Sequence, residues 1–327
     1  MSREVAGATL AIHPGALGDV LLAIPALRAL RAAGDRVTLA AQPRIASLLV
    51  ALGEADDGCD FESLRLDALF AGESGARLPA VERVVCWFGA RDPDFARRLA
   101  AISPGALVAA SIDRGGLTPP SHTPGDREEL TPPSDTPGAP GRAVWRHLLA
   151  TIGDARERRD VAYVSDTLVA EGRAALAGAG SDGARRVVVV HPGAGSAAKR
   201  WPAAAFAEAL AALAARSDVE IVVHEGPADT EPAARLLRLV PSARGLREPA
   251  LPALAGVLAK CAAYVGNDSG VSHLAAVVGA PAVVLFAAAN LAWRPWARAV
   301  RVLTVALERA EAGDVSEVRG ALDAALG

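Results

Sequence analysis

Short runs of β-branched and other apolar residues alternate along this chain with longer segments rich in alanine and leucine. The longer segments, clearest at residues 20–33, 202–216 and 251–261, repeat apolar positions every three or four residues, which predicts amphipathic helices. The short runs are continuously apolar, as in strands buried on both faces. They predict strands at residues 9–13, 36–40, 83–88, 106–112, 186–191, 219–224, 263–266 and 282–286. Strands that alternate with helices in this way indicate an α/β fold with parallel sheets.

One segment breaks this alternation. Residues 115–141 contain two nearly identical phrases, LTPPSHTPG at 117–125 and LTPPSDTPG at 130–138. Because prolines at this density prevent both helix and strand pairing, we expect an extended and mobile loop. A duplicated, tolerated surface loop is the favoured interpretation, and a recognition element is the alternative.

The proline-rich loop lies near the end of the first half of the pattern. A chain of 327 residues is long enough for two domains. A helix predicted at 143–152 closes the first half, and a linker near 161–167 leads into the second. We therefore expect an N-terminal domain over residues 1–165 and a C-terminal domain over residues 166–327, two α/β domains that face each other across a cleft.

Composition narrows the class of protein. Apolar residues make up 51% and charged residues 22%, which excludes disorder for most of the chain. A net charge of −3 and a pI near 6.1 argue against nucleic acid as a partner. Cys59, Cys86 and Cys261 are too widely spaced for a disulfide framework or a zinc site, and a reducing compartment fits them. The apolar stretches at 5–30 and 269–293 are both interrupted, so neither a signal peptide nor a membrane span is expected.

The first segment with chemical potential is HPGALGDVLLAIPALRALR, residues 13–31. A strand ends at His13, and Gly18 and Asp19 open a helix that Pro25 is expected to kink. Ligands of open parallel sheets bind beyond the carboxyl ends of the strands. Asp19 is therefore either a helix cap or a carboxylate that accepts a proton from an acceptor hydroxyl.

The second segment is VVVVHPGAGSAAKRWP, residues 187–202. Its glycines allow backbone N–H groups to approach an anion, and Lys199 supplies a point charge, which indicates phosphate binding. Gly193, Gly195 and Ala198 also satisfy a dinucleotide-binding fingerprint. That fingerprint needs its third small residue inside the helix, whereas residues 199–202 delay the helix here, so binding of NAD is not supported.

The third segment is YVGNDSGVSHLAAVVGAPAVVLF, residues 264–286. Asp268 or Ser269 is expected to cap a helix whose free N–H groups point toward the same ligand as the loop that contains Gly193 and Gly195, called the glycine loop below. His273 lies about one turn into this helix. It is either a buried core residue or a ligand of a phosphate oxygen.

Together, and in this order, the three segments resemble the signatures of glycosyltransferase family 9, the bacterial heptosyltransferases of lipopolysaccharide core assembly. The likeness spans the chain except for the proline repeat. It implies a GT-B fold, with two Rossmann-like domains whose parallel sheets face a central cleft. The donor would bind mainly to the second domain and the acceptor to the first. The family uses an ADP-heptose donor, inverts the anomeric centre, and needs no metal or other cofactor.

The resemblance also assigns residues. Asp19 matches the family's catalytic base, Lys199 its diphosphate-contacting lysine, and Glu225 the place where nucleotide ribose binds. The expected donor site comprises Gly193, Gly195, Ser196, Arg200, Glu225, Asp268, Ser269, Gly270 and His273, and the acceptor side includes Gly18 and His13. His13 stands where relatives commonly have arginine. Without a metal, the departing diphosphate needs cations and oriented N–H groups, which we expect from Lys199, Arg200, His273 and two helix N-termini.

The implied setting is the cytoplasm, with a lipid-linked or glycan acceptor, peripheral contact with the inner membrane and a monomeric enzyme. No strongly basic, aromatic-rich membrane-binding helix is evident. Three alternatives stay open: a transferase that uses another nucleotide sugar, a binding protein that has lost transfer, and an NAD-linked oxidoreductase that uses residues 193–198.

Overall fold

The computed structural model describes residues 7–112 and 143–327, and the proline-rich repeat lies outside these residues. The described chain divides into two compact units. The first unit contains the described residues of 1–15, 22–158 and 289–294, and the second contains residues 16–21, 159–288 and 295–327. Residues 16–21 therefore belong to the second unit, although the strand that precedes them belongs to the first.

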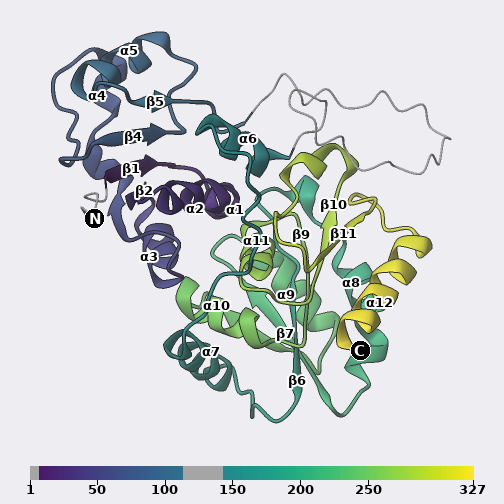
Figure 1. The fold of residues 1–327 in the computed structure, drawn as a ribbon. Coiled ribbons are helices and arrows are strands. Elements are labelled where there is room, and N and C mark those ends of the chain that lie inside the picture. Colours follow the sequence, from purple (N-terminus) through teal and green to yellow (C-terminus); the bar gives the residue numbers. More distant parts are fainter. Residues whose placement is uncertain (1–6, 113–142) are drawn as a thin grey trace. The chain divides into compact units, whose positions relative to one another are not determined.

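The first unit is built on a parallel five-stranded sheet with the order β3-β2-β1-β4-β5 (Figure 1). Its strands are β1 (Ala8–Ile12), β2 (Arg36–Ala41), β3 (Asp57–Asp60), β4 (Arg83–Cys86) and β5 (Leu107–Val108). The predicted strand at 106–112 is wrong in length, because only Leu107 and Val108, both half-buried, pair with β4. β3 was not predicted, because its sequence, DGCD, is polar and largely exposed.

The helices of the first unit are α2 (Ile24–Ala32), α3 (Pro43–Ala51), α4 (Asp67–Ala71), α5 (Pro93–Ile102) and α6 (Val144–Thr151), with a 3-10 turn at Phe61–Leu64. The single kinked helix expected over residues 20–33 is instead two helices, α1 (Leu17–Leu22) and α2. The chain breaks at Ala23 because Pro25 lacks the N–H that a continuous helix needs. Most of α1 belongs to the second unit.

The second unit is built on a parallel six-stranded sheet with the order β11-β10-β9-β6-β7-β8. Its strands are β6 (Arg186–His191), β7 (Val219–Glu225), β8 (Arg244–Arg247), β9 (Ala263–Asn267), β10 (Ala282–Phe286) and β11 (Val300–Thr304). The edge strands β8 and β11 were not predicted because exposed arginines interrupt their apolar pattern. The strand order reverses direction between β6 and β9, and this is where open parallel sheets bind ligands.

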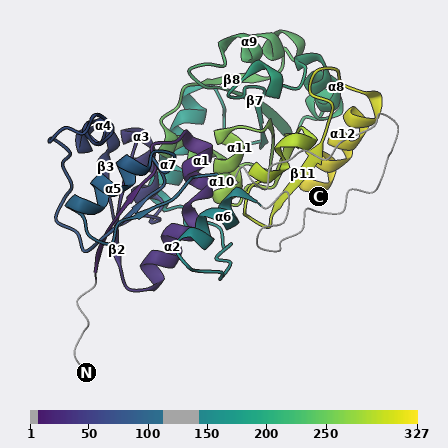
Figure 2. The same ribbon diagram turned by 90° about the horizontal axis from the view of Figure 1, so that it is seen from above.

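Six longer helices flank this sheet: α7 (Asp166–Gly178), α8 (Ala203–Ala214), α9 (Thr230–Leu239), α10 (Leu251–Lys260), α11 (Gly270–Val277) and α12 (Ala312–Leu326), with 3-10 turns at Ala197–Lys199 and Ala288–Trp293. Apolar side chains of α8, α9 and α12 share one core with the strands, and α8 and α12 lie side by side in both views (Figures 1 and 2). α10 packs on α7 and α11. The linker predicted at 161–167 ends earlier, because Ser165 caps α7.

Two exclusions made from the sequence concern the thiols and the membrane. Cys59, Cys86 and Cys261 are free, as the spacing predicted, and the last two are buried. Among the residues that the structure describes, no helix is both long enough and apolar enough to cross a bilayer. The apolar stretch at 269–293 is divided between α11 and β10, which agrees with its interpretation as an interrupted segment.

Candidate active site

The loop after β6 has the form expected of an anion-binding loop. His191 ends β6, a 3-10 turn covers Ala197–Lys199, and α8 begins only at Ala203. Ala198 therefore lies outside the helix, which counts against the dinucleotide fingerprint. A side chain at Gly193 would collide with Asp229, whereas one at Gly195 would extend into open space.

The side chain of Asn267 ties this loop to the end of β9. Its Oδ1 accepts the Trp201 N–H at 3.0 Å, and its Nδ2 donates to the Pro192 carbonyl at 2.9 Å. Asn267 is fully buried, so these bonds fix both ends of the loop in a low-dielectric environment. Sequence reasoning did not single out Asn267, because its partners lie more than sixty residues away in the chain.

Lys199 and Asp268 form an ion pair at the end of the glycine loop. The Lys199 Nζ lies 2.7 Å from Oδ2 of Asp268, whose side chain is buried while that of Lys199 is about one-third exposed. The following residue, Ser269, caps α11 by accepting the Ser272 N–H. Lys199 is thus directed by a buried carboxylate toward the start of α11, where free N–H groups favour an anion.

Asp19 joins this pair from α1. It is the third residue of that helix, and its carboxylate accepts the N–H of Ala16. This hydrogen bond satisfies a free N–H at the start of the helix, as the capping interpretation requires. Burial raises the pKa of the Asp19 carboxyl above its ordinary value of 3.8. The Ala16 N–H and the Lys199 ammonium oppose this increase, and the Asp268 charge adds to it. Asp19 therefore interacts electrostatically with both members of the ion pair.

His273 is buried in the same place. Burial lowers the pKa of its imidazole to about 4, although Asp268 pulls in the opposite direction. His273 is therefore neutral near pH 7, and it can offer an N–H but not the positive charge expected of it. A Cβ on Gly18 would lie 2.9 Å from Cδ2 of His273, and one on Gly270 would lie 2.9 Å from the Leu17 Cβ. The starts of α1 and α11 thus pack with their backbones in close approach.

A second polar group lies beside the glycine loop, at the ends of β6 and β7. The Nδ1 atoms of His191 and His224 are 3.0 Å apart, and Nε2 of His191 lies 3.8 Å from Oδ2 of Asp229. An Nη of Arg200 lies 3.8 Å from Oδ1 of Asp229, which has no hydrogen-bond partner within the described part of the chain. Burial lowers the pKa of both histidines, that of His224 to about 3.

Sequence reasoning found Arg200 in this group but missed Asp229 and the two histidines. Polar residues at the ends of neighbouring predicted strands were the available signal. Glu225, which was selected instead, ends β7, and its Oε1 is engaged: Thr230 donates to it at 3.0 Å, and Nε of Arg247 lies 3.3 Å away.

Ser196 and His13 complete the predicted set. Ser196 is exposed on the glycine loop, and its carbonyl accepts the Lys199 N–H. His13 is buried in the first unit, which lowers its pKa to about 4. Its Nδ1 accepts the Gly15 N–H at 3.2 Å, so the proton resides on Nε2, which has no hydrogen-bond partner among the described residues.

The second unit therefore brings together Asp19, Lys199, Asp268 and His273 near the glycine loop. Within residues 7–112 and 143–327, no group of three or more histidine, cysteine, aspartate or glutamate side chains could hold a metal ion. The available chemistry is anion binding by a lysine and backbone N–H groups, next to a carboxylate of raised basicity.

Comparison with known proteins finds a relative in sequence and several in fold. Lipopolysaccharide heptosyltransferase 3 of Escherichia coli is 34% identical over 119 residues, a match that spans 33% of this chain and 34% of that relative. A family 9 glycosyltransferase of Veillonella parvula has the same fold, with a TM-score of 0.72 and 17% identity over 98% of this chain and 97% of the other.

Two Escherichia coli structures extend the agreement in fold. ADP-heptose lps heptosyltransferase II gives a TM-score of 0.69 at 19% identity, covering 97% of this chain and 98% of the other. Heptosyltransferase WaaC with ADP gives 0.64 at 15% identity, covering 97% and 99%. These likenesses confirm the predicted α/β class and GT-B fold with two parallel sheets. The model of glycosyltransferase family 9 (heptosyltransferase) matches residues 145–318, more than half of the sequence, and the chain belongs to this family.

Proposed function

We propose that this chain transfers a heptose from an ADP-heptose donor to a lipopolysaccharide-core or other envelope glycan, with inversion and without a metal ion. Membership of a heptosyltransferase family supports the reaction class. The observation that carries the proposal is the position of Asp19 beside the Lys199–Asp268 ion pair, at the end of an anion-binding loop.

The proposed reaction follows from the charges of these groups. The oxygen of an acceptor hydroxyl attacks the anomeric carbon of the donor, and the bond from that carbon to the diphosphate breaks. Asp19 takes the hydroxyl proton, a step that its raised pKa favours. The leaving ADP gains negative charge, which the Lys199 ammonium, Arg200 and the N–H groups at the start of α11 stabilise.

Asp229 is the better candidate than Glu225 for the acidic residue that binds the nucleotide ribose. Thr230 and Arg247 both contact Oε1 of Glu225, so that oxygen is already engaged. Asp229 lies against Gly193, and its Oδ1 has no hydrogen-bond partner among the described residues, although Arg200 lies 3.8 Å away. A ribose hydroxyl bound at the glycine loop would satisfy that oxygen.

The acceptor implies the setting that we propose for the enzyme. An enzyme at the cytoplasmic face of the inner membrane can reach a lipid-linked glycan acceptor. We propose that the protein acts there, and that it does so as a monomer. Sedimentation with vesicles that contain lipopolysaccharide, compared with vesicles that lack it, measures this contact.

Thermal stabilisation by nucleotides tests the donor site. We expect ADP to stabilise the protein more than UDP, GDP, CMP or NAD, and a ligand at about 100 times its Kd adds about 2.7 kcal/mol. Lys199→Ala should abolish the shift, whereas Lys260→Ala should retain it. Lys260 is the only other lysine in the sequence and lies exposed at the end of α10, so it is the matched control.

The same assay, combined with a measurement of sugar transfer, separates the alternatives. A preference for UDP or GDP would keep the transferase and reject the heptose donor, and ADP binding without turnover would indicate a binding protein. Stabilisation by NAD alone would overturn the proposal. For the ribose contact, Asp229→Asn should remove the preference for ADP over 2′-deoxy-ADP, while Glu225→Gln should leave it unchanged.

A further inference from the structure

We propose that Trp296 is a positioning residue for Asp19: its indole N–H fixes the end of α1 and so holds the Asp19 carboxylate beside Lys199 and Asp268. This inference rests on the proposed function for the role of Asp19. It extends that role to a residue outside the three segments that carry the family signatures.

The need for such a residue arises from Pro25. In a continuous helix, the carbonyl of Leu21 would accept the N–H of residue 25, and proline has no N–H. The Trp296 Nε1–H donates to the Leu21 carbonyl instead, at 2.8 Å. Leu21 is fully buried and Trp296 is 1% exposed, so water cannot take the place of the indole.

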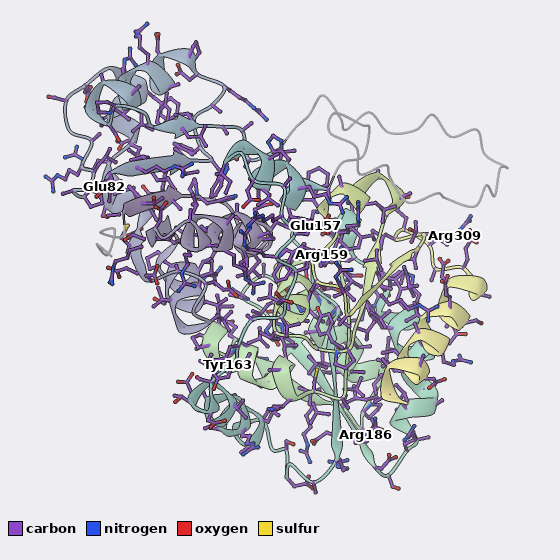
Figure 3. All side chains as sticks on the ribbon, viewed as in Figure 1. Glu82, Glu157, Arg159, Tyr163, Arg186 and Arg309 are labelled. Carbon is purple, nitrogen blue, oxygen red and sulfur yellow. The ribbon has the colours of Figure 1, made fainter. Side chains whose placement is uncertain are left out.

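Trp296 is itself held in place within the second unit. The Nε of Arg159, labelled in Figure 3, donates to the Trp296 carbonyl. Arg159, Trp296 and Leu21 all belong to this unit. The indole is therefore an anchored donor, and the end of α1 is bound to it.

The start of α1 is fixed by a different contact. Gly18 and Gly270 face each other, and a Cβ on either would crowd the other helix: one on Gly270 would lie 3.2 Å from the Gly18 nitrogen. Neither glycine has a positive φ, so close approach is the reason for their small size. This contact joins α1 to the helix that carries His273.

Asp19 lies between these two attachments. α1 has six residues, too few to hold a helical conformation or a direction by itself. The orientation of the Asp19 carboxylate therefore depends on the glycine contact at one end and on the Trp296 bond at the other. Loss of the bond should move the base relative to the diphosphate site without removing any donor-binding group.

Trp296→Phe tests this because it keeps an aromatic ring and removes only the N–H and part of the indole. We expect kcat for heptose transfer to fall about 10- to 100-fold, the cost of a misplaced reacting group. The Kd for ADP should stay within about threefold of wild type, because the substitution removes no group that binds the donor. An unchanged kcat, or a loss of ADP affinity as large as the loss of kcat, overturns the proposal.

Hydrogen exchange gives a readout that does not depend on activity. In Trp296→Phe, the amides of residues 17–22 should exchange faster, while those of β6 and α8 keep their protection. Trp145→Phe is the matched control, because it changes a buried tryptophan of the first unit and should leave α1 protected. If the wild type transfers no sugar from any donor, the proposed function fails, and exchange alone decides whether Trp296 fixes α1.

The double variant Pro25→Ala with Trp296→Phe separates positioning from simple stabilisation. Alanine at 25 restores the backbone N–H, so the Leu21 carbonyl regains a partner in a continuous helix. We expect the Tm lost in Trp296→Phe to be recovered while kcat stays low, because the break that directs α1 is gone. Recovery of both would mean that the carbonyl needed only a partner, which overturns a positioning role for Trp296.

Discussion

Burial raises the pKa of Asp19 and makes its carboxylate a better proton acceptor than that of an exposed aspartate. The same burial acts on His273 in the opposite direction and leaves it neutral. The Lys199 ammonium is paired with a buried carboxylate and is about one-third exposed. At the level of single residues, the site therefore separates a base, a neutral N–H donor and a cation by their surroundings.

Asp19→Asn should lower kcat for transfer by about 10²- to 10⁴-fold, the usual contribution of a general base. Asparagine has nearly the same shape but cannot accept the acceptor's proton at neutral pH. The Kd for ADP, measured by calorimetry, should change little, because Asp19 is not a phosphate ligand in this mechanism. Retention of more than half of the wild-type kcat would contradict the assignment and leave Asp19 with its role at the start of α1.

Packing of secondary-structure elements depends on glycines at two places in the second unit. Besides the α1–α11 contact, α7 and α10 approach closely where Gly172 faces Gly256. A Cβ on Gly256 would lie 1.8 Å from the Leu168 carbonyl oxygen, which a side-chain movement cannot relieve. The spacing between these helices is thus set by the absence of a side chain.

Gly256→Ala should therefore destabilise the second unit by about 1–3 kcal/mol or more, since α7 and α10 must separate. Gly178→Ala, at the end of α7, is the control, because a Cβ there meets nothing within 4 Å. Its higher helix propensity should raise stability by up to about 1 kcal/mol. Urea unfolding monitored by circular dichroism measures both, and equal effects of the two substitutions would refute the packing argument.

For the whole molecule, two compact units mean two hydrophobic cores and two sources of stability. A chain of this kind need not unfold in one transition. Buried neutral histidines occur in both units: His13 in the first, and His191, His224 and His273 in the second. Stability should therefore depend on pH in each unit.

We expect the free energy of unfolding to fall as pH drops from about 6.5 toward about 4. The unfolded histidines bind protons below their ordinary pKa of 6.5, whereas His13 and His273 have native pKa values of about 4 and His224 of about 3. Their stabilising contribution is complete above pH 6.5 and is lost on acidification. Asp19, with its raised pKa, acts in the opposite sense.

Urea titrations between about pH 7 and about pH 5 measure this dependence, within the range where histidine titrates. His273→Gln should make the decrease smaller for the transition of the second unit and leave that of the first unit unchanged. A free energy of unfolding that is constant over this range would show that the histidines take up protons in the native state.

The sequence by itself determined the α/β class, most central strands and the three segments that carry the candidate site residues. Continuously apolar strands such as β6 and β10 match their predicted bounds, because a strand buried on both faces must be apolar at every position. Lys199, Asp268 and Asp19 were found for a related reason: each lies in the loop or the first helical turn that comes after a strand. Such signals depend only on residues that are adjacent in the sequence, so they can be recognised without the tertiary structure.

Only the tertiary structure decided which distant residues share an environment. The polar edge strand β3 forms because it pairs with the backbone of β2. Asp229 is a candidate ligand of the nucleotide because it lies against Gly193. The break before α2 follows from Pro25, but the partner that Leu21 then finds, Trp296, lies 275 residues away. Burial, pKa and hydrogen bonding depend on contacts across the chain, and no local pattern of residues specifies them.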